Sequence, residues 1–199
     1  MIYFSSDLHF NHNKDFLYKP RGFDSIDTMN MAVVTNWNSI VTNEDDVYIL
    51  GDLMLGDNEA GIHLLKLLNG KLHIILGNHD TDTRIELYKK LENVVEICYA
   101  TQLKYKKAYF FLCHYPVVTA NFDDQLPWAK HLISLFGHTH QQHIFYNDNP
   151  YMYNVGLDAH NCYPVSIEQI IEDVKNKKDE INHIKNKKGE EECQNREIF

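Results

Sequence analysis

Residues 72–80 read Leu-His-Ile-Ile-Leu-Gly-Asn-His-Asp. The apolar run at 72–76 predicts a short buried strand, and Gly77 permits a sharp turn out of it. Asn78, His79 and Asp80 then place an amide, an imidazole and a carboxylate together where the strand ends. Taken alone, the stretch fits an ordinary Gly-Asn turn as well as it fits a metal and phosphate site. The second interpretation requires partner residues elsewhere in the chain.

Two earlier apolar runs, at 2–6 and 47–50, also predict short buried strands. Apolar residues recur at three- and four-residue steps over 26–41 and again over 64–68, which predicts amphipathic helices between the strands. Strands that alternate with helices predict a parallel sheet, and the carboxyl ends of its strands are the usual place for a site.

The two earlier strands end in the same chemistry as 77–80. Asp7 and His9 follow the first strand, and Asp52 follows the second. Alternate residues of an extended segment project to the same side, so Asp7 and His9 are expected to point to one place. Three successive strand ends that each carry a carboxylate or an amide make a plain surface turn at 77–80 a poor interpretation.

The second half of the chain has a different pattern. A capping-box motif, Thr83-x-x-Glu86, predicts a short helix. Strand-like runs then follow one another over 94–112 with little helix between them, which predicts antiparallel or mixed pairing. His114 follows the last of these runs. A loop over 118–127 leads to another predicted strand at 132–136.

That strand is followed by Gly137-His138-Thr139-His140, another pair of side chains two residues apart. Further on, Ser166-x-x-Gln169 predicts the start of a last amphipathic helix. From Lys175 the chain is highly charged with few apolar residues, so a frayed helix or tail is favoured over an interaction element. These patterns predict one domain over 1–174 and a charged C-terminal helix or tail over 175–199.

At 199 residues the chain has the length of one domain with a substantial core. The net charge of −9 argues against a general nucleic-acid-binding surface, and so against long duplex nucleic acid as a partner. The four cysteines are scattered without a C-x-x-C pair, which favours reduced thiols and a cytoplasmic protein. No apolar run approaches the roughly 18 residues of a membrane span, and the early Asp7 argues against a signal peptide. The oligomeric state is not indicated.

The strand-end side chains suit a metal centre. Imidazoles, carboxylates and one amide are ligands for manganese, zinc or iron, and no cysteine takes part. Their number exceeds what one ion needs, so two divalent ions are expected, with manganese favoured and iron, zinc or nickel as alternatives. Two ions roughly 3.5–4 Å apart can clamp a phosphoryl oxygen and lower the pKa of a bridging water.

Five motifs in this order resemble the calcineurin-like metallophosphoesterases: Asp-x-His at 7–9, Gly-Asp at 51–52, Gly-Asn-His-Asp at 77–80, the lone His114 before Tyr-Pro, and Gly-His-Thr-His at 137–140. The resemblance covers residues 1–158. Residues 6–12, Ser-Asp-Leu-His-Phe-Asn-His, resemble a small branch of the family found in bacteria and their phages.

The resemblance implies an α/β fold, a four-layer α/β/β/α sandwich of two mixed sheets. It implies that seven side chains hold two metals, with Asp52 shared between them: Asp7, His9 and His140 for one, Asn78, His114 and His138 for the other. It also implies that His79 donates a proton to the leaving oxygen and that Asp80 orients the His79 ring.

One motif indicates which subfamily is disfavoured, and the roles of three further residues are less well defined by the sequence. Residues 51–57, Gly-Asp-Leu-Met-Leu-Gly-Asp, lack the arginine that protein Ser/Thr phosphatases of this family carry here, which disfavours a protein phosphatase. His12 could face the substrate or be a solvated loop residue. Arg21 and Arg84 are expected to be surface charges rather than phosphate contacts.

The expected function is hydrolysis of a phosphodiester by attack of a metal-bridging hydroxide, on a small nucleotide, a cyclic nucleotide or a nucleic-acid end. A diester is preferred because no second cationic group is evident for a phosphomonoester dianion. A phosphomonoesterase is the alternative. A second alternative is a scaffold protein that retains the metals but works by contact with other proteins.

Overall fold

The computed structural model describes residues 1–119 and 132–196, and side chains as far as residue 186. Its first sheet has the order β4-β3-β2-β1-β9. The strands β1 (Ile2–Ser5), β2 (Asp46–Leu50), β3 (Lys71–Ile75) and β4 (Val94–Cys98) are parallel, while β9 (Val165–Ser166) pairs antiparallel with β1. The three predicted N-terminal strands and their parallel pairing are confirmed.

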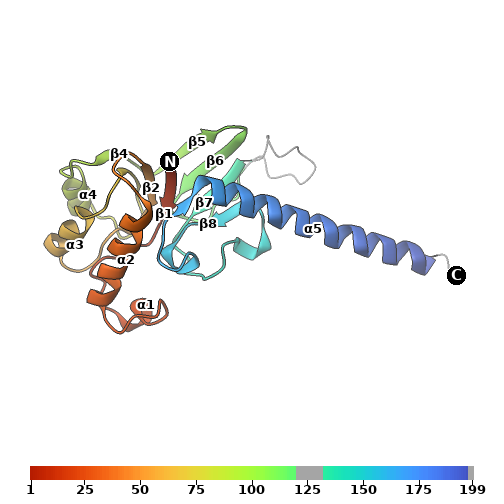
Figure 1. Cartoon of the computed structure of the whole chain (residues 1–199), viewed down its shortest axis with the longest axis horizontal. Coiled ribbons are helices and arrows are strands. Elements are labelled where there is room, and N and C mark those ends of the chain that lie inside the picture. Colours follow the sequence, from red (N-terminus) through yellow and green to blue (C-terminus); the bar gives the residue numbers. More distant parts are fainter. Residues whose placement is uncertain (120–131, 197–199) are drawn as a thin grey trace.

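Helices α2 (Ile26–Ile40), α3 (Asn58–Leu65) and α4 (Asp82–Tyr88) lie beside this sheet (Figure 1). Their apolar faces and the sheet form one core, in which Met29, Val33 and Trp37 are fully buried. The helical periodicity predicted over 26–41 is therefore confirmed. Ser25 caps α2 by accepting the Thr28 amide at 3.2 Å.

Two local predictions in this half are wrong. Helix α4 begins at Asp82 after Thr81, so Thr83 lies inside its first turn and cannot be the cap. Residues 10–21 are polar and aromatic without a period, which predicts a loop, yet they contain a short helix, α1 (Asp15–Tyr18). Leu17 and Tyr18 of α1 are buried in the core of the first sheet, which accounts for its order.

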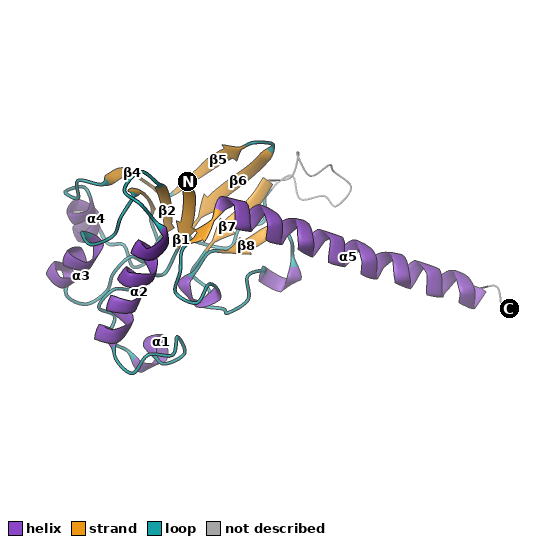
Figure 2. Ribbon diagram, in the orientation of Figure 1, coloured by secondary structure: helices purple, strands orange, loops and turns teal. Residues whose placement is uncertain are grey.

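The second sheet has the order β5-β6-β7-β8 (Figure 2). Strands β5 (Ala100–Tyr105) and β6 (Ala108–Cys113) form an antiparallel hairpin, whereas β6, β7 (Leu132–Phe136) and β8 (Met152–Asn154) are parallel. Mixed pairing was predicted for this half, but from Val94 onward. In the structure β4 still belongs to the first sheet, so the change comes after it. The predicted α/β fold of two mixed sheets with helices is confirmed.

A second core joins the two sheets. Phe110 and Leu112 of β6 pack in it with Phe4 of β1 and Leu50 of β2. The first turns of α5 (Ile167–Arg196) enter the same core through their isoleucines and Val174. Two 3-10 helices, η2 (Tyr146–Asp148) and η3 (Leu157–Ala159), follow β7 and β8.

Helix α5 begins as predicted, because Ser166 Oγ accepts the Gln169 amide at 3.1 Å. The helix then runs without a break to Arg196 and extends away from the two sheets (Figure 1). The charged C-terminal segment is therefore a continuation of the last buried helix. No helix in the described part of the chain is both long and apolar enough to cross a membrane. Most of the loop predicted at 118–127 lies outside the described residues.

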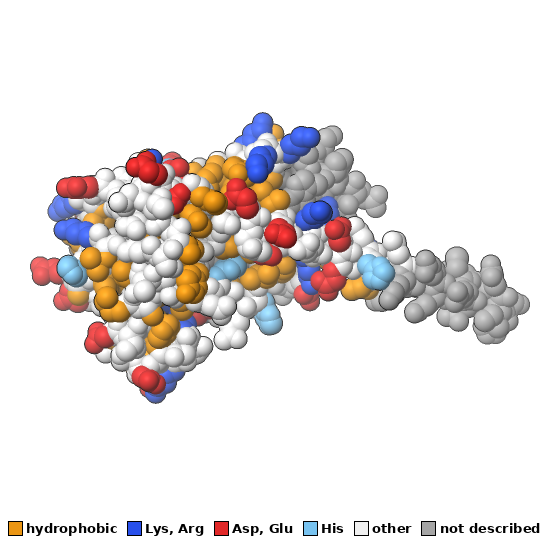
Figure 3. Space-filling model, in the orientation of Figure 1, with side chains coloured by type: hydrophobic (Ala, Val, Ile, Leu, Met, Phe, Trp, Pro, Cys, Tyr) orange, Lys and Arg blue, Asp and Glu red, His pale blue; other side chains and the backbone are white. Residues whose placement is uncertain are grey.

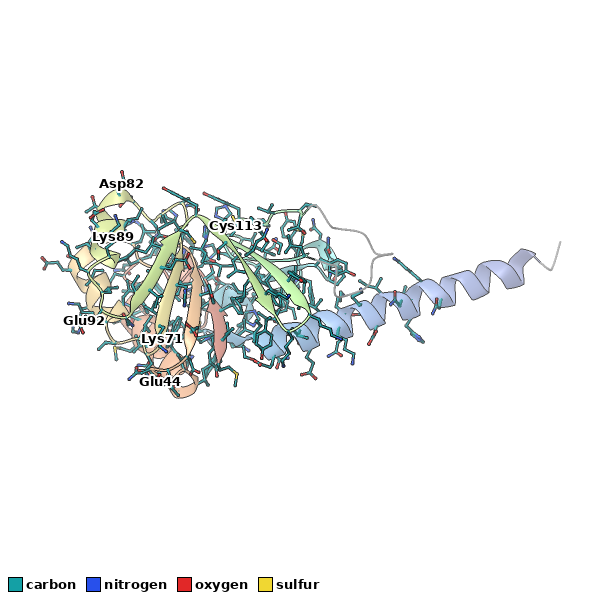
Figure 4. All side chains as sticks on the ribbon, turned by 90° about the horizontal axis from the view of Figure 1, so that it is seen from above. Glu44, Lys71, Asp82, Lys89, Glu92 and Cys113 are labelled. Carbon is teal, nitrogen blue, oxygen red and sulfur yellow. The ribbon has the colours of Figure 1, made fainter. Side chains whose placement is uncertain are left out.

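The arrangement of strands gives the molecule one functional edge. Glu44 and Lys71 lie at the end of the sheets where β3 begins, and Cys113 lies at the opposite end, where β6 finishes (Figure 4). The parallel strands β1, β2 and β3 also finish at that opposite end. The polar segments that follow five strands therefore meet there.

Candidate metal centre

One group of side chains comes from the segments after β1 and β7. His9 Nε2 and His140 Nε2 are 3.1 Å apart, and each lies 3.8 Å from Asp7 Oδ1. Asp7 and His9 are buried, while His140 is partly exposed. These three residues form a group whose ligand atoms lie close enough to hold one metal ion.

A second group comes from the segments after β3, β6 and β7. His114 Nδ1 lies 2.7 Å from the Leu50 carbonyl oxygen, so this nitrogen carries the ring hydrogen and donates it. The lone pair of the neutral ring is then on Nε2. This atom faces Asn78 Oδ1 at 3.0 Å and His138 Nδ1 at 3.1 Å. Ring nitrogens and an amide oxygen therefore converge on one point.

Asp52 lies between the two groups. Its Oδ2 atom is 3.7 Å from His9 Nε2 and 3.6 Å from His114 Nε2. The ligand atoms of Asp7, Asp52 and His114 also lie close enough to one another to hold a metal ion. A single carboxylate within reach of both groups is the geometry that a shared ligand of two ions requires.

The electrostatics of these atoms fit a bound cation. Burial, with the nearby His140 and Arg21, lowers the pKa of His9 to about 2, so its ring is neutral. Burial also opposes protonation of His140, but Asp158 and Asp7 outweigh it and raise its pKa. Asp7 Oδ1 is buried without a hydrogen-bond donor among the described residues. Acceptor atoms that face one another in a buried site need a positive charge between them, and a divalent metal ion supplies it.

The backbone at the site adopts a conformation that L-residues avoid. Positive φ angles occur at Asp7 (57°), His9 (48°), Asp52 (57°), His138 (66°) and His140 (51°). Each such residue costs roughly 1–3 kcal/mol, and strain of this kind clusters at functional sites. The expectation that extended strand geometry aims Asp7 and His9 together was therefore wrong. Left-handed turns bring their side chains together instead.

Two glycines allow the segments to approach one another. A Cβ atom on Gly77 would lie 2.3 Å from Asp52 Oδ1, and one on Gly137 would lie 1.9 Å from Ser6 Oγ. Neither glycine has a positive φ angle. Their role is to leave room for the neighbouring segment rather than to permit a special turn.

Asp80 was expected to orient the His79 ring, but its hydrogen bonds go to other groups. Its Oδ2 atom accepts hydrogen bonds from the amides of Gly77 and Asp52 at 2.8 and 2.9 Å. Its Oδ1 atom accepts the Tyr88 hydroxyl at 2.9 Å. Asp80 therefore joins the segments after β2 and β3 and fixes the backbone of Asp52. Tyr88, fully buried in α4, is a residue that the sequence did not indicate.

Asp158, in η3, is another residue of the site that the sequence did not predict. It accepts hydrogen bonds from Arg21 Nε at 2.9 Å and Arg21 Nη2 at 2.7 Å, and lies 3.1 Å from His140 Nδ1. The Arg21 and His140 contacts outweigh burial and lower the pKa of Asp158. A charged carboxylate on Nδ1 directs the Nε2 lone pair of His140 towards His9. The signal of Asp158 in the sequence is a polar residue four positions past the end of β8.

The prediction that Arg21 is a surface charge is wrong. Its side chain is 1% exposed, and besides Asp158 it donates to the Asp7 carbonyl oxygen at 2.9 Å. Arg84 is half-buried and donates to Asn58 Oδ1 at 3.1 Å and to the His79 carbonyl oxygen. Both arginines therefore brace the loops around the site.

His79 and His12 lie in a cavity of about 570 Å³ beside the candidate ligands. The His79 side chain is 43% exposed, with Nε2 3.9 Å from Asp52 Oδ2. Its backbone amide donates to Asp52 Oδ1 at 2.9 Å. The His12 ring is 5.3 Å from that of His9 and 6.5 Å from that of His79. The structure thus brings every predicted site residue to one edge of the sheets.

Comparison with known proteins identifies the class. The model of the calcineurin-like phosphoesterase superfamily domain matches residues 1–176. An uncharacterized protein of Methanocaldococcus jannaschii is 36% identical over 178 residues, covering 85% of this chain and 89% of that protein. The gene 66 protein of Mycobacterium phage D29 is 31% identical over 195 residues, covering 87% and 96%.

Among solved structures, a protein of unknown function from Aquifex aeolicus is similar in fold. The TM-score is 0.64 at 22% identity, covering 86% of this chain and 98% of that one. The chain belongs to the calcineurin-like phosphoesterase superfamily. It is a metal-binding hydrolase of phosphate esters, as the five motifs predicted.

Proposed function

We propose that the protein hydrolyses a phosphodiester with two divalent metal ions bound at the candidate metal centre. The observation that carries the proposal is the position of Asp52 Oδ2, at 3.7 Å from His9 Nε2 and 3.6 Å from His114 Nε2. One ion would be held by the group after β1 and β7, and the other by the group after β3, β6 and β7. The residues in question are Asp7, His9, His140, Asn78, His114 and His138, with Asp52 shared.

Two bound ions would neutralise charge on the phosphoryl oxygens and lower the pKa of a water between them, with manganese favoured and iron, zinc or nickel as alternatives. The chain itself supplies the remaining functions. Asp52 is held in place through Asp80, which accepts its amide hydrogen. His79, partly exposed to the cavity, donates a proton to the departing oxygen.

The lining of the cavity favours a diester over a monoester. Its described side chains include histidines, Asn78, Asp52 and Asp158 but neither lysine nor arginine. The Arg21 guanidinium, which adjoins the lining residue Asp158, is buried in its pair with that residue. A monoester dianion would bring two negative charges, the second with no lysine or arginine among the described lining residues to receive it, whereas a diester carries a single negative charge. A phosphomonoesterase remains the second candidate.

Small substrates are favoured over long nucleic acid. The net charge is −9, and on the face drawn in Figure 3 acidic and basic side chains are interspersed rather than gathered into one basic surface. Such a surface gives little electrostatic attraction to a phosphate backbone. The proposed substrates are therefore small nucleotides, cyclic nucleotides or a nucleic-acid end.

The proposed setting is the cytoplasm. Cys98, Cys113 and Cys162 are free thiols, while Cys193 lies where side chains are not described. We also propose a single catalytic domain over 1–174, with the charged part of α5 as an extension of it.

The first test compares bis(4-nitrophenyl) phosphate with 4-nitrophenyl phosphate, using purified protein loaded with Mn²⁺. We expect turnover of both to need metal and the diester to have the higher kcat/KM. Turnover no higher than that of EDTA-treated protein would exclude the enzyme and favour the metal-retaining scaffold. A higher kcat/KM for the monoester would exclude the diester preference and leave the metal centre intact.

The second test separates the residue roles. Asp52→Asn should abolish turnover and lower the bound metal per chain, because it weakens the shared ligand. His79→Ala should leave metal content unchanged and lower turnover of an alkyl diester about 10²–10⁴-fold, the usual contribution of a general acid. The exposed His63→Ala is the matched control and should change neither quantity. Unchanged turnover of the alkyl diester in His79→Ala would remove the proton donor from the mechanism.

A further inference from the structure

A row of aromatic rings leads from the candidate metal centre to the surface. The His9 and His12 ring centroids are 5.3 Å apart, and those of His12 and Phe16 are 5.6 Å apart with the planes at 84°. His12, Phe16, Leu17 and Pro20 line the same cavity as His79. All four belong to the segment between β1 and α2. One part of the cavity lining is therefore apolar and aromatic, and another part carries the metal-binding side chains.

The exposure of Phe16 is set by the fold around it. Phe16 is 72% exposed, whereas its neighbours Leu17 and Tyr18 are 3% and 8% exposed. The buried neighbours hold α1 against the core and leave Phe16 at the mouth of the cavity. A phenylalanine side chain that is exposed to water at the mouth of an active-site cavity offers an apolar surface on which a ligand can pack.

The segment is also held at both ends, so the aromatic wall has a defined position. Asn30 Nδ2 donates to Asn11 Oδ1 at 2.9 Å, and Asn30 is 3% exposed. At the other end, Arg21 is fixed by Asp158 and the Asp7 carbonyl. A wall braced in this way needs little ordering when a ligand binds, which favours recognition.

We propose that His12, Phe16, Leu17 and Pro20 form a subsite for a flat aromatic ring in the organic part of the substrate, such as a nucleoside base. The proposal rests on the proposed phosphodiesterase function, since the phosphate must lie at the candidate metal centre. Phe16, Leu17 and Pro20 are apolar and His12 is aromatic, so this part of the lining can recognise that group by stacking and apolar contact. The His12 ring is 6.5 Å from that of His79, so the subsite adjoins the scissile ester.

The test measures equilibrium binding rather than turnover. Adenosine 5′-monophosphate and ribose 5-phosphate share the phosphate and the sugar, and differ by the base. Each is titrated calorimetrically into Mn²⁺-loaded protein. Stacking of one base on an aromatic side chain corresponds to roughly a 5-fold to 150-fold change in Kd. We expect the nucleotide to bind more tightly by a factor in that range.

Variants assign the effect to the wall. Phe16→Ala should remove most of the difference by weakening the nucleotide alone, and Phe16→Trp should preserve it. Tyr99→Ala is the matched control, because Tyr99 is a similarly exposed aromatic residue, at 74%, outside the cavity lining. It should leave both Kd values unchanged.

Two outcomes overturn the subsite: equal Kd values for the two ligands in the unmodified protein, or a Kd ratio that Phe16→Ala leaves unchanged, whether or not both ligands bind more weakly. A protein that shows the base-dependent difference but turns over no ester would contradict the proposed function and retain the subsite. A protein that turns over the aryl diester and binds the two ligands equally would retain the function and lose the subsite.

Discussion

Replacing Asp158 by leucine should lower both the stability and the metal affinity of the protein. Asp158 pairs with Arg21 through two hydrogen bonds, and their side chains are only 9% and 1% exposed. The variant leaves the Arg21 guanidinium buried without its counter-charge, which costs about 3–5 kcal/mol. That is a large part of the roughly 5–15 kcal/mol that holds a typical domain folded.

The same change removes the carboxylate that accepts a hydrogen bond from His140 Nδ1. Loss of such a partner behind a metal-binding histidine typically lowers metal affinity about 10–100-fold. Arg21→Met combined with Asp158→Leu separates the two effects. Replacing a buried ion pair by apolar side chains is often neutral for stability, so the double variant should regain stability but not metal affinity.

Unfolding by guanidinium chloride, followed by circular dichroism in EDTA, gives the stability of each variant. Competition with a chromogenic chelator gives its Mn²⁺ or Zn²⁺ affinity. Lys177→Met is the control, because it breaks an ion pair with Asp148, which is 91% exposed, and should cost less than about 1 kcal/mol. If Asp158→Leu costs no more than this control, the buried pair is not structural. If the double variant binds metal as tightly as the unmodified protein, Asp158 does not orient His140.

Three further outcomes follow from the site. Gly77→Ala should lower bound metal per chain, measured by elemental analysis, because its Cβ would lie 2.3 Å from Asp52 Oδ1; an unchanged metal content would contradict this. Tyr88→Phe should lower the free energy of unfolding by about 1–3 kcal/mol, since Asp80 loses a buried donor; an unchanged denaturation midpoint would refute this. Mn²⁺ at a hundred times its Kd should raise the free energy of unfolding by about 2.7 kcal/mol for each ion bound, and EDTA should reverse it.

The sequence could predict where the buried strands end, because the residues that mark a strand end are adjacent in the chain. An apolar run followed by a glycine or polar group marks where a buried strand stops, and this pattern located Asp52, Asn78 and the residues around them. The pairing of β1, β2 and β3 followed from the helices between them. The sequence could not show that β4 belongs to the first sheet, because β4 and β5 both have the pattern of a short strand.

Local reasoning failed where a partner is remote. Thr83-x-x-Glu86 matches a capping box, yet α4 had already begun at Asp82. Arg21 was expected to be a surface charge because arginine is rarely buried unless it is paired. Its partner Asp158 is 137 positions away, and the burial of the pair depends on the packing of both halves.

By itself, the sequence determined which chemical groups stand at the strand ends, their order, and the family that this order defines. Only the tertiary structure decided which of them meet. His9 and His140 are 131 positions apart in the chain, yet their Nε2 atoms lie 3.1 Å from each other. Asp80 joins the loops after β2 and β3 and does not orient the His79 ring. The physical reason is that a ligand set depends on distances, burial and lone-pair directions. Those are set by left-handed turns and remote hydrogen bonds that no local pattern records.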